Sequence, residues 1–184
     1  IRLPRGHRTW QGEGEEWHSF ASVYKKSPQL LLKGDFEKHG HSGFIWLMRS
    51  DILYKHGLYD CNIAGSGDHV MSHAFTGDWD SSCITRIMSG NKLHTKHFET
   101  WAKKVYRDIK ARVGFTPGNI WHLWHGETEH RRYVLRNREL AEFGFNPYKD
   151  IRKTRNGLWK WASNKQRLHL WAKEYFGQRR EDGE

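Results

Sequence analysis

The chain has few of the residues that stabilise secreted or membrane proteins. Only two of its 184 residues are cysteine, Cys61 and Cys83, which is too few for a disulfide framework or a four-cysteine zinc site. No run of about 18 apolar residues occurs, so the sequence predicts no membrane span. Its polar, basic start differs from a secretory signal peptide. Together these absences predict a cytoplasmic protein.

Hydrophobic residues are also scarce, at 36%, but aromatic ones are abundant, with ten Trp, seven Tyr and nine Phe. Disordered chains are poor in aromatic residues, so this chain is expected to fold. Its length suffices for one domain with a buried core. The first residue is Ile1 rather than Met, which leads us to expect a fragment of a longer protein.

The charge is strongly basic, because 31 Lys and Arg outnumber 21 Asp and Glu by ten. Such an excess favours the binding of nucleic acid, another polyanion or an anionic substrate. The basic residues are scattered, with concentrations at Arg131–Arg132 and 152–155, and no known nucleic-acid module signature is present. A basic polyanion-binding domain, or a structural domain without catalytic activity, is therefore the alternative to an enzyme.

Hydrophobic periodicity predicts a mixed α/β fold with several amphipathic helices and short strands. The clearest helix spans 93–112, where an apolar stripe recurs with helical spacing. The stripe comprises Phe98, Trp101, Ala102, Val105 and Ile109. Further helices are predicted over 49–56, 69–75, 128–143 and 164–177, and a short one within 19–32 that is interrupted before Pro28. Strands are predicted over 43–48 and 118–122, and a loop over 78–92.

The segment Gly65-Ser66-Gly67-Asp68 is the first candidate for chemistry. Two glycines permit a tight turn and a close approach of the backbone to a ligand. Asp68 follows them at the start of a predicted helix, where an aspartate commonly serves as an N-cap. Alternatively, the turn holds the carboxylate ready to accept a proton from a bound hydroxyl group.

A second candidate is the pair His122 and His125, which lies among tryptophans. Histidine is the commonest metal ligand, but the His-Glu-x-x-His pattern of zinc peptidases is absent. If the strand continued through both residues, they would point to opposite faces and need not serve one site. A packed or exposed histidine pair is the other interpretation.

Two charged pairs complete the set of candidates. Asp78 and Asp80 form an Asp-x-Asp pattern, which binds the metal of nucleotide sugars at the end of a buried strand. Here Gly77 and a predicted helix precede the pair, so the sequence predicts a plain acidic loop. Arg131 and Arg132 begin a predicted helix, where they either contact phosphate or form a solvated helix face.

Taken in order, several of these segments resemble GT-A-fold glycosyltransferases of the family-2-like, inverting type, including bacterial and phage members. The resemblance covers most of residues 40–180. It is carried by the segments His41–Trp46, Gly57–Asp60, Gly65–Asp68, Pro117–His122, His125–Tyr133 and Gly144–Pro147.

The resemblance implies transfer of a sugar from a nucleotide-sugar donor to a saccharide or other hydroxyl acceptor. Asp68 would be the general base, His122 would bind a divalent cation (Mn²⁺ or Mg²⁺), and His125 is a second candidate ligand. The residues that would bind substrate are Gly43, Trp46, Gly65, Ser66, Gly67, Arg131 and Arg132.

This chain departs from the family pattern at two places. Gly67 stands where many relatives carry a glutamate, and residues 1–40 do not supply the upstream Asp-x-Asp. The resemblance therefore implies a partial, Rossmann-like GT-A domain. Residues 1–150 would form its C-terminal, acceptor-side part and residues 151–184 a C-terminal helical extension. The nucleotide-binding half would be missing or supplied by another chain.

Overall fold

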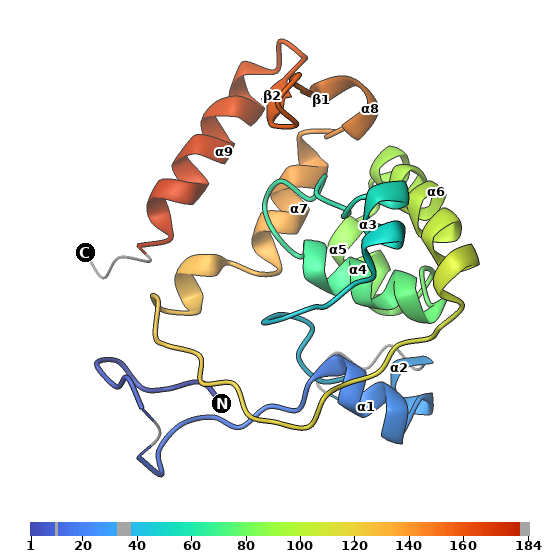
Figure 1. Ribbon diagram of the computed structural model, residues 1–184. Helices are drawn as coiled ribbons and strands as arrows, with labels where there is room; N and C mark the ends of the chain where they lie inside the picture. Colours follow the sequence, from blue (N-terminus) through green and yellow to red (C-terminus); the bar gives the residue numbers. More distant parts are fainter. Residues whose placement is uncertain (10, 33–37, 181–184) are drawn as a thin grey trace.

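A computed structural model describes residues 1–9, 11–32 and 38–180, and helices predominate in it (Figure 1). The helices are α1 (Phe20–Lys26), α2 (Gln29–Leu32), α3 (Ser50–His56), α4 (Gly67–Thr76), α5 (Ser82–Met88), α6 (Lys92–Ile109), α7 (Leu135–Glu142), α8 (Pro147–Asp150) and α9 (Gln166–Gln178), with a 3₁₀ turn at Glu129–Arg131. The strands are β1 (Ile151–Lys153) and β2 (Trp159–Trp161). The described residues thus form a mostly helical α/β structure.

The centre of the molecule is the packing of α6 against α4, with α3 and α5 beside them. Phe98, Ala102 and Val105 of α6 are fully buried, while Trp101 and Ile109 pack partly buried against the same core. The apolar stripe predicted from the sequence is therefore confirmed. Burying a large apolar side chain contributes about 1.5–3 kcal/mol, so this stripe is what holds α6 in place.

The C-terminal part adds one antiparallel hairpin and a long helix. In the hairpin, Ile151 pairs with Trp161 and Lys153 with Trp159. Leu168 and Tyr175 of α9 belong to the same core as α4 and α6. The helix predicted over 164–177 is confirmed, whereas the hairpin was not predicted, because its strands are too short to show a periodic pattern.

The N-terminal segment lies beside the extended segment that joins α6 to α7 (Figure 1). The Leu3 amide donates to the His122 carbonyl at 2.9 Å, and the His122 amide donates to the Ile1 carbonyl at 2.8 Å. These bonds fix the backbone at His122 from a part of the chain that is distant in sequence.

Both predicted strands are wrong in the described residues. Within 43–48, Trp46 and Met48 pack against the core while Ile45 and Leu47 are exposed. Buried and exposed side chains thus alternate along 43–48 as in a strand, but no neighbouring strand pairs with the segment. In 118–122 the only pairing is an isolated bridge between His122 and Arg2. Strands need partners, which local sequence does not reveal.

One predicted loop and one predicted helix also differ from the structure. The segment 78–92 contains α5, whose N-cap Ser81 accepts a hydrogen bond from the Ile84 amide at 3.4 Å. The helix predicted over 128–143 begins only at Leu135. Arg132 has a left-handed φ of 48° after the 3₁₀ turn, and this conformation interrupts a continuous helix.

No helix among the described residues combines the length and apolar character needed to cross a bilayer. The sheet in this part of the chain consists of β1 and β2 alone. The described structure is therefore mixed α/β, as expected, but its helical share is larger than the sequence suggested.

Candidate functional site

Asp68 lies in the first turn of α4, next to the chain segment that precedes Phe44. Ser66 is the N-cap of this helix, so Asp68 is not the capping residue. The Asp68 side chain is half-buried, and Ser42 Oγ donates to its Oδ2 at 3.5 Å. A Cβ at Gly43 would lie 3.2 Å from the same oxygen. The same Cβ would lie 2.8 Å from His41 Cε1, so glycine at this position lets the His41 ring and the Asp68 carboxylate lie close to the backbone.

His41 lies on the other side of Gly43. The Gly43 amide donates to His41 Nδ1 at 3.0 Å, and the His41 ring stacks on Phe44 with centroids 4.2 Å apart. Loss of solvent around the ring lowers the pKa of His41, although the Asp68 carboxylate opposes this shift. His41 is a site residue that the sequence interpretation did not single out.

His122 and His125 meet in space. The Phe44 ring contacts His122 edge-on at 5.1 Å, and the two Nε2 atoms of His122 and His125 are 3.1 Å apart. Because no regular strand continues past His122, the expected opposite orientation of the two side chains does not occur. Burial, together with His125 and Arg131, lowers the pKa of His122. A neutral imidazole retains a lone pair that can bind a metal ion.

The two predicted phosphate-binding arginines have different surroundings. Arg131 Nη2 lies 2.9 Å from His125 Nε2 and donates to the His125 carbonyl at 3.3 Å. Arg132 instead forms an ion pair with Glu139. Arg131 therefore belongs to the histidine cluster, whereas the charge of Arg132 is balanced by a helix neighbour.

A third arginine, Arg136, supports the turn before Asp68 from behind. It is only 4% exposed and donates to Ser66 Oγ at 3.1 Å and to the Tyr175 hydroxyl at 2.8 Å. A Cβ at Gly65 would lie 2.8 Å from Arg136 Nη2. Gly65 thus provides the space for this guanidinium, and Ser66 accepts a hydrogen bond from it. Spacing in the sequence does not reveal either role.

Trp46 and Gly67 have mainly structural surroundings. The Trp46 indole donates to the Ser42 carbonyl at 2.7 Å and packs edge-on against Phe75. At Gly67, a Cβ would lie 3.2 Å from the Tyr59 carbonyl. Both residues shape the backbone around Asp68, and their predicted contact with substrate stays a prediction.

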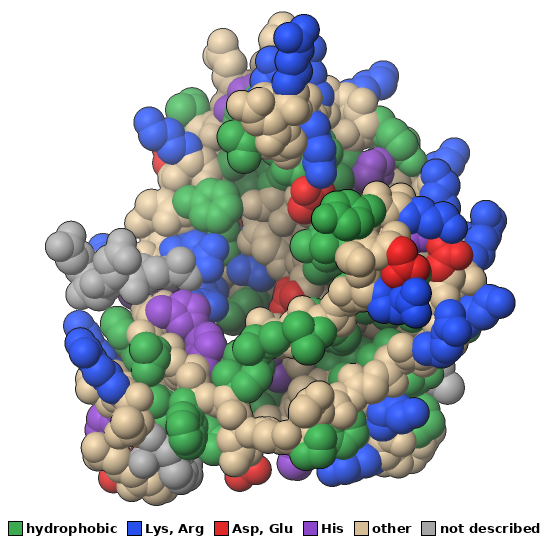
Figure 2. Space-filling view, in the orientation of Figure 1, with side chains coloured by type: hydrophobic (Ala, Val, Ile, Leu, Met, Phe, Trp, Pro, Cys, Tyr) green, Lys and Arg blue, Asp and Glu red, His purple; other side chains and the backbone are tan. Residues whose placement is uncertain are grey.

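These contacts bring three distant segments together: the turn around His41 and Phe44, the start of α4, and residues 122–131. The space-filling view shows a hollow near the middle of the face, with histidine, basic and acidic side chains on its walls and hydrophobic groups at its rim (Figure 2). On this face, most other Lys and Arg side chains lie at the periphery. The polyanion-binding alternative stays a prediction.

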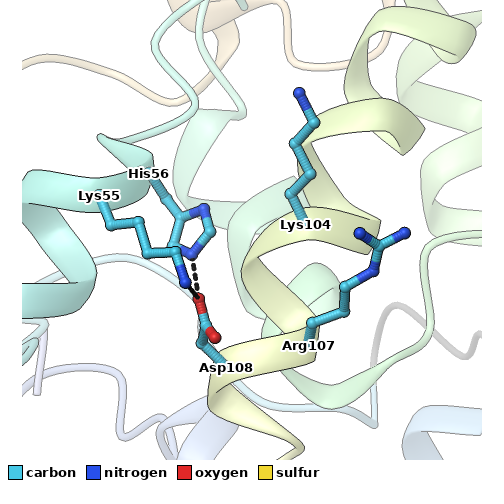
Figure 3. Close-up of a pocket in the computed structure, with 5 residues that line it drawn as sticks. All are labelled: Lys55, His56, Lys104, Arg107 and Asp108. Carbon is cyan, nitrogen blue, oxygen red and sulfur yellow. Dashed lines mark hydrogen bonds and ion pairs between the residues drawn. The ribbon is translucent and has the colours of Figure 1, made fainter.

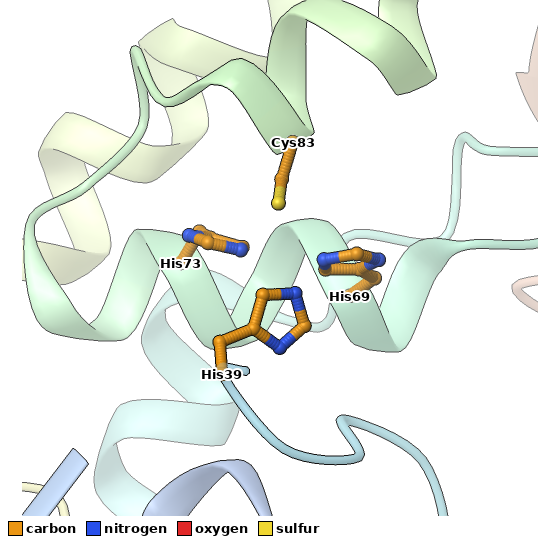
Figure 4. Close-up of side chains that lie close together, drawn as sticks. All are labelled: His39, His69, His73 and Cys83. Atoms are coloured by element: carbon orange, nitrogen blue, oxygen red, sulfur yellow. The ribbon is translucent and has the colours of Figure 1, made fainter. Parts of the chain in front are cut away.

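A second cluster lies inside the protein. His39, His69, His73 and Cys83 are all buried, and one possible ligand atom from each lies within 4.8 Å of the others (Figure 4). These four side chains are close enough to hold a metal ion. The sequence interpretation missed the cluster, although His69 and His73 are four residues apart and so share one helix face.

Asp78 is bound to this cluster, which corrects the prediction of a plain acidic loop. Its side chain is 7% exposed, and Oδ2 accepts a hydrogen bond from His73 Nδ1 at 2.8 Å. Asp80, by contrast, is exposed. The two aspartates of the Asp-x-Asp pattern therefore differ in burial, because Asp78 is buried and Asp80 is exposed.

A third group of charged side chains lines an open pocket of about 350 Å³ between α3 and α6 (Figure 3). Lys55 and His56 both bind Asp108 Oδ2, at 2.8 and 2.5 Å. These contacts lower the pKa of Asp108. Lys104 and Arg107 extend from α6 at the same pocket. The Asp108 carboxylate therefore offsets part of the positive charge at this pocket.

Comparison of the chain with protein-family models, with curated proteins and with solved structures found no match.

Proposed function

We propose that the chain forms the acceptor side of an inverting, metal-dependent glycosyltransferase. The observation that carries the proposal is the chain of contacts that leads from Asp68 through Gly43 and Phe44 to His122, His125 and Arg131. These residues were selected from the sequence for complementary roles. A carboxylate can act as a base, an imidazole can bind a metal ion and a guanidinium can bind a diphosphate.

Asp68 is the general base in this proposal. Its carboxylate accepts the proton of an acceptor hydroxyl while the hydroxyl oxygen bonds to the anomeric carbon and the bond to the nucleoside diphosphate breaks. Base catalysis of this kind contributes about 10²–10⁴-fold. The Ser42 hydroxyl, 3.5 Å from Oδ2, orients the carboxylate.

His122 and His125 would hold the divalent cation. Their Nε2 atoms, 3.1 Å apart, fit two neighbouring positions around one ion, since metal–nitrogen bonds of about 2.0–2.1 Å separate adjacent ligands by roughly 3 Å. When bound, the ion would neutralise charge on the departing diphosphate. Mg²⁺ and Mn²⁺ both prefer oxygen ligands, so oxygens of the diphosphate would complete the coordination beside the two imidazoles. Arg131, whose Nη2 lies 2.9 Å from His125 Nε2, would leave that contact to bind the diphosphate with two parallel hydrogen bonds.

The proposal includes a division of the catalytic domain. The described residues contain one two-stranded sheet, so the Rossmann-like, nucleotide-binding half of a GT-A domain would come from outside these 184 residues. The nucleotide sugar would bind between the two parts, and a saccharide or other hydroxyl compound would enter from the Asp68 side. A cytoplasmic location fits a nucleotide-sugar donor.

The substitution Asp68→Asn tests this function in the full-length protein. Transfer is measured as release of nucleoside diphosphate from a panel of nucleotide sugars with Mn²⁺ and candidate acceptors. We expect turnover to fall about 10²–10⁴-fold, because the amide cannot accept the proton, while the circular dichroism spectrum is unchanged.

Asp80→Asn is the matched control, since Asp80 is exposed and has no role in the proposed transfer. This variant should retain full turnover. Equal turnover in Asp68→Asn and in the unmodified protein would remove Asp68 as the base. Loss of Mn²⁺ dependence in His122→Ala would further support the proposed metal ligands.

A further inference from the structure

The buried cluster of His39, His69, His73 and Cys83 has no role in the transfer proposed above. Its ligands come from three places: His39 from the segment before the Gly43 turn, His69 and His73 from α4, and Cys83 from the first turn of α5. In Figure 4 the three imidazoles and the thiol surround a common point. We propose that these four side chains bind a structural zinc ion.

The donor set is the first argument. Zinc in structural sites is four-coordinate and is bound by cysteine sulfur and histidine nitrogen. Ideal tetrahedral bonds would place the donor atoms about 3.3–3.7 Å apart, and the four atoms here lie within 4.8 Å of one another. Small rotations of the rings close that difference. Three nitrogens and a sulfur are poor ligands for Mg²⁺ or Ca²⁺, which prefer oxygen.

The second argument concerns which ring nitrogen is available. His73 Nδ1 donates to the Asp78 carboxylate at 2.8 Å, and His39 Nδ1 donates to the Gly40 carbonyl at 2.7 Å. In a neutral imidazole, a proton on Nδ1 leaves the lone pair on Nε2. A carboxylate or carbonyl behind a histidine is the usual arrangement around metal-binding imidazoles.

The third argument is the cost of the cluster without a metal. His73 is fully buried, and its Nε2 has no hydrogen-bond partner. Leaving a buried polar atom unsatisfied costs about 1–3 kcal/mol. A zinc ion at the centre of the cluster gives this atom a ligand bond. It also balances charge, because Zn²⁺, a Cys83 thiolate and the Asp78 carboxylate sum to zero.

The site is structural because protein side chains occupy all four positions and shield them from water. Exposed fractions are 2% for His39, 7% for His69, 0% for His73 and 2% for Cys83. The ion would connect the segment at His39 to α4 and α5. Since Asp68 precedes His69 directly, it would also fix the first turn of α4. The zinc proposal stands independently of the glycosyltransferase proposal.

Metal analysis of the purified chain tests the site. The 184-residue chain is produced with zinc in the medium, purified without chelators and analysed by mass spectrometry of the elements. We expect close to one zinc per chain. Cys83→Ser and His73→Ala should lower this content about tenfold or more. Cys61→Ser and His94→Leu are matched controls, because Cys61 and His94 are also buried but lie outside the cluster.

Cobalt substitution gives a measurement that does not depend on folding of the variants. Co²⁺ added to the metal-free natural chain should produce the intense visible bands of four-coordinate cobalt and a near-ultraviolet thiolate band. Zinc should abolish both. Zinc-free protein that also gives no thiolate band with Co²⁺ would overturn the proposal, as would equal zinc content in Cys83→Ser and the natural chain.

Discussion

At the residue scale, burial controls the protonation of histidines in this protein. His94 is the clearest case outside the candidate sites. It lies on α6, stacks on Tyr59 with centroids 6.4 Å apart and contacts Phe145 edge-on at 5.2 Å. Only 4% of its surface is exposed. Burial lowers the pKa of His94 to about 3, so the folded protein holds this ring in its neutral form.

Replacing His94 should therefore change how stability depends on pH. In the unfolded chain, the pKa of histidine is about 6.5. Between that pH and about 3, the unfolded state therefore binds a proton at His94 that the folded state does not bind. The free energy of unfolding consequently falls as pH decreases through this window. From pH 6.5 to pH 5, the natural chain should lose about 2 kcal/mol more than His94→Leu.

Urea unfolding at the two pH values measures this difference. His18→Leu is the control, because His18 is exposed, and it should keep the pH dependence of the natural chain. An unchanged pH dependence in His94→Leu would contradict the assignment of His94 as a neutral buried residue.

Single residues differed in how well the sequence revealed them. Asp68, His122 and His125 were selected because glycine turns and closely spaced histidines are visible locally. His39 and Cys83 were not, since they lie 44 positions apart in the sequence. Their proximity depends on how the segment before Gly43 packs over α4 and α5.

At the scale of elements, the turn before α4 sets the position of Asp68. Gly65 has a left-handed φ of 111°, and Ser66 is also left-handed with φ 66°. Arg136, from α7, fills the space beside the turn and donates to Ser66 Oγ. The Asn137 amide, also from α7, donates to the same oxygen at 3.4 Å, so two side chains couple the orientation of α4 to α7.

The substitution Gly65→Ala should disrupt this turn. The new Cβ would lie 2.8 Å from Arg136 Nη2, and Arg136 is too buried to move away easily. Strain at a left-handed residue costs about 1–3 kcal/mol. With the steric contact, we expect a total loss of about 2–4 kcal/mol in the free energy of unfolding, measured by chemical denaturation.

Gly157→Ala separates backbone strain from the steric contact. Gly157 also has a left-handed φ, of 77°, but no atom lies within 4 Å of the position of its Cβ. This variant should lose only about 1 kcal/mol. Equal losses in the two variants would show that the contact with Arg136 contributes nothing.

Length and end signals both affected which elements could be predicted. The apolar stripe of α6 extends over several turns and gave a clear signal. The helix α5 has seven residues and β1 has three, too few for periodicity alone to distinguish them from loops. The equally short α3 was predicted because Gly57 marks its end. The segment 43–48 shows the opposite error, because its alternating burial is set by contact with the core and not by strand pairing.

At the scale of the whole molecule, the candidate functional site and the proposed zinc site both require the N-terminal segments to pack against the helical core. Phe20 of α1 contacts the rings of His39 and His73, with centroids 5.5 and 5.3 Å apart. In the proposed zinc site, the metal adds bonds at the same junction. Removing the metal should therefore loosen one region rather than the entire fold.

Hydrogen exchange with and without a chelator tests this regional effect. After zinc removal, amides in residues 39–46 and in α1 should exchange faster, because their packing onto α4 loses the bonds through His39. Amides of α9 should be unaffected, since α9 carries none of the four ligands. A uniform increase along the chain, or none at all, would contradict the predicted role of the metal.

Composition and local spacing were enough to predict that the chain folds, that α6 supports a helical core and that Asp68 follows a glycine turn. These features depend on residues that are close in the chain. The contact between His122 and His125, the packing of Arg136 against the turn before α4, and the buried cluster of His39 and Cys83 arise from the folded structure. Such contacts join segments more than 40 residues apart or follow from irregular backbone, and no local pattern specifies either.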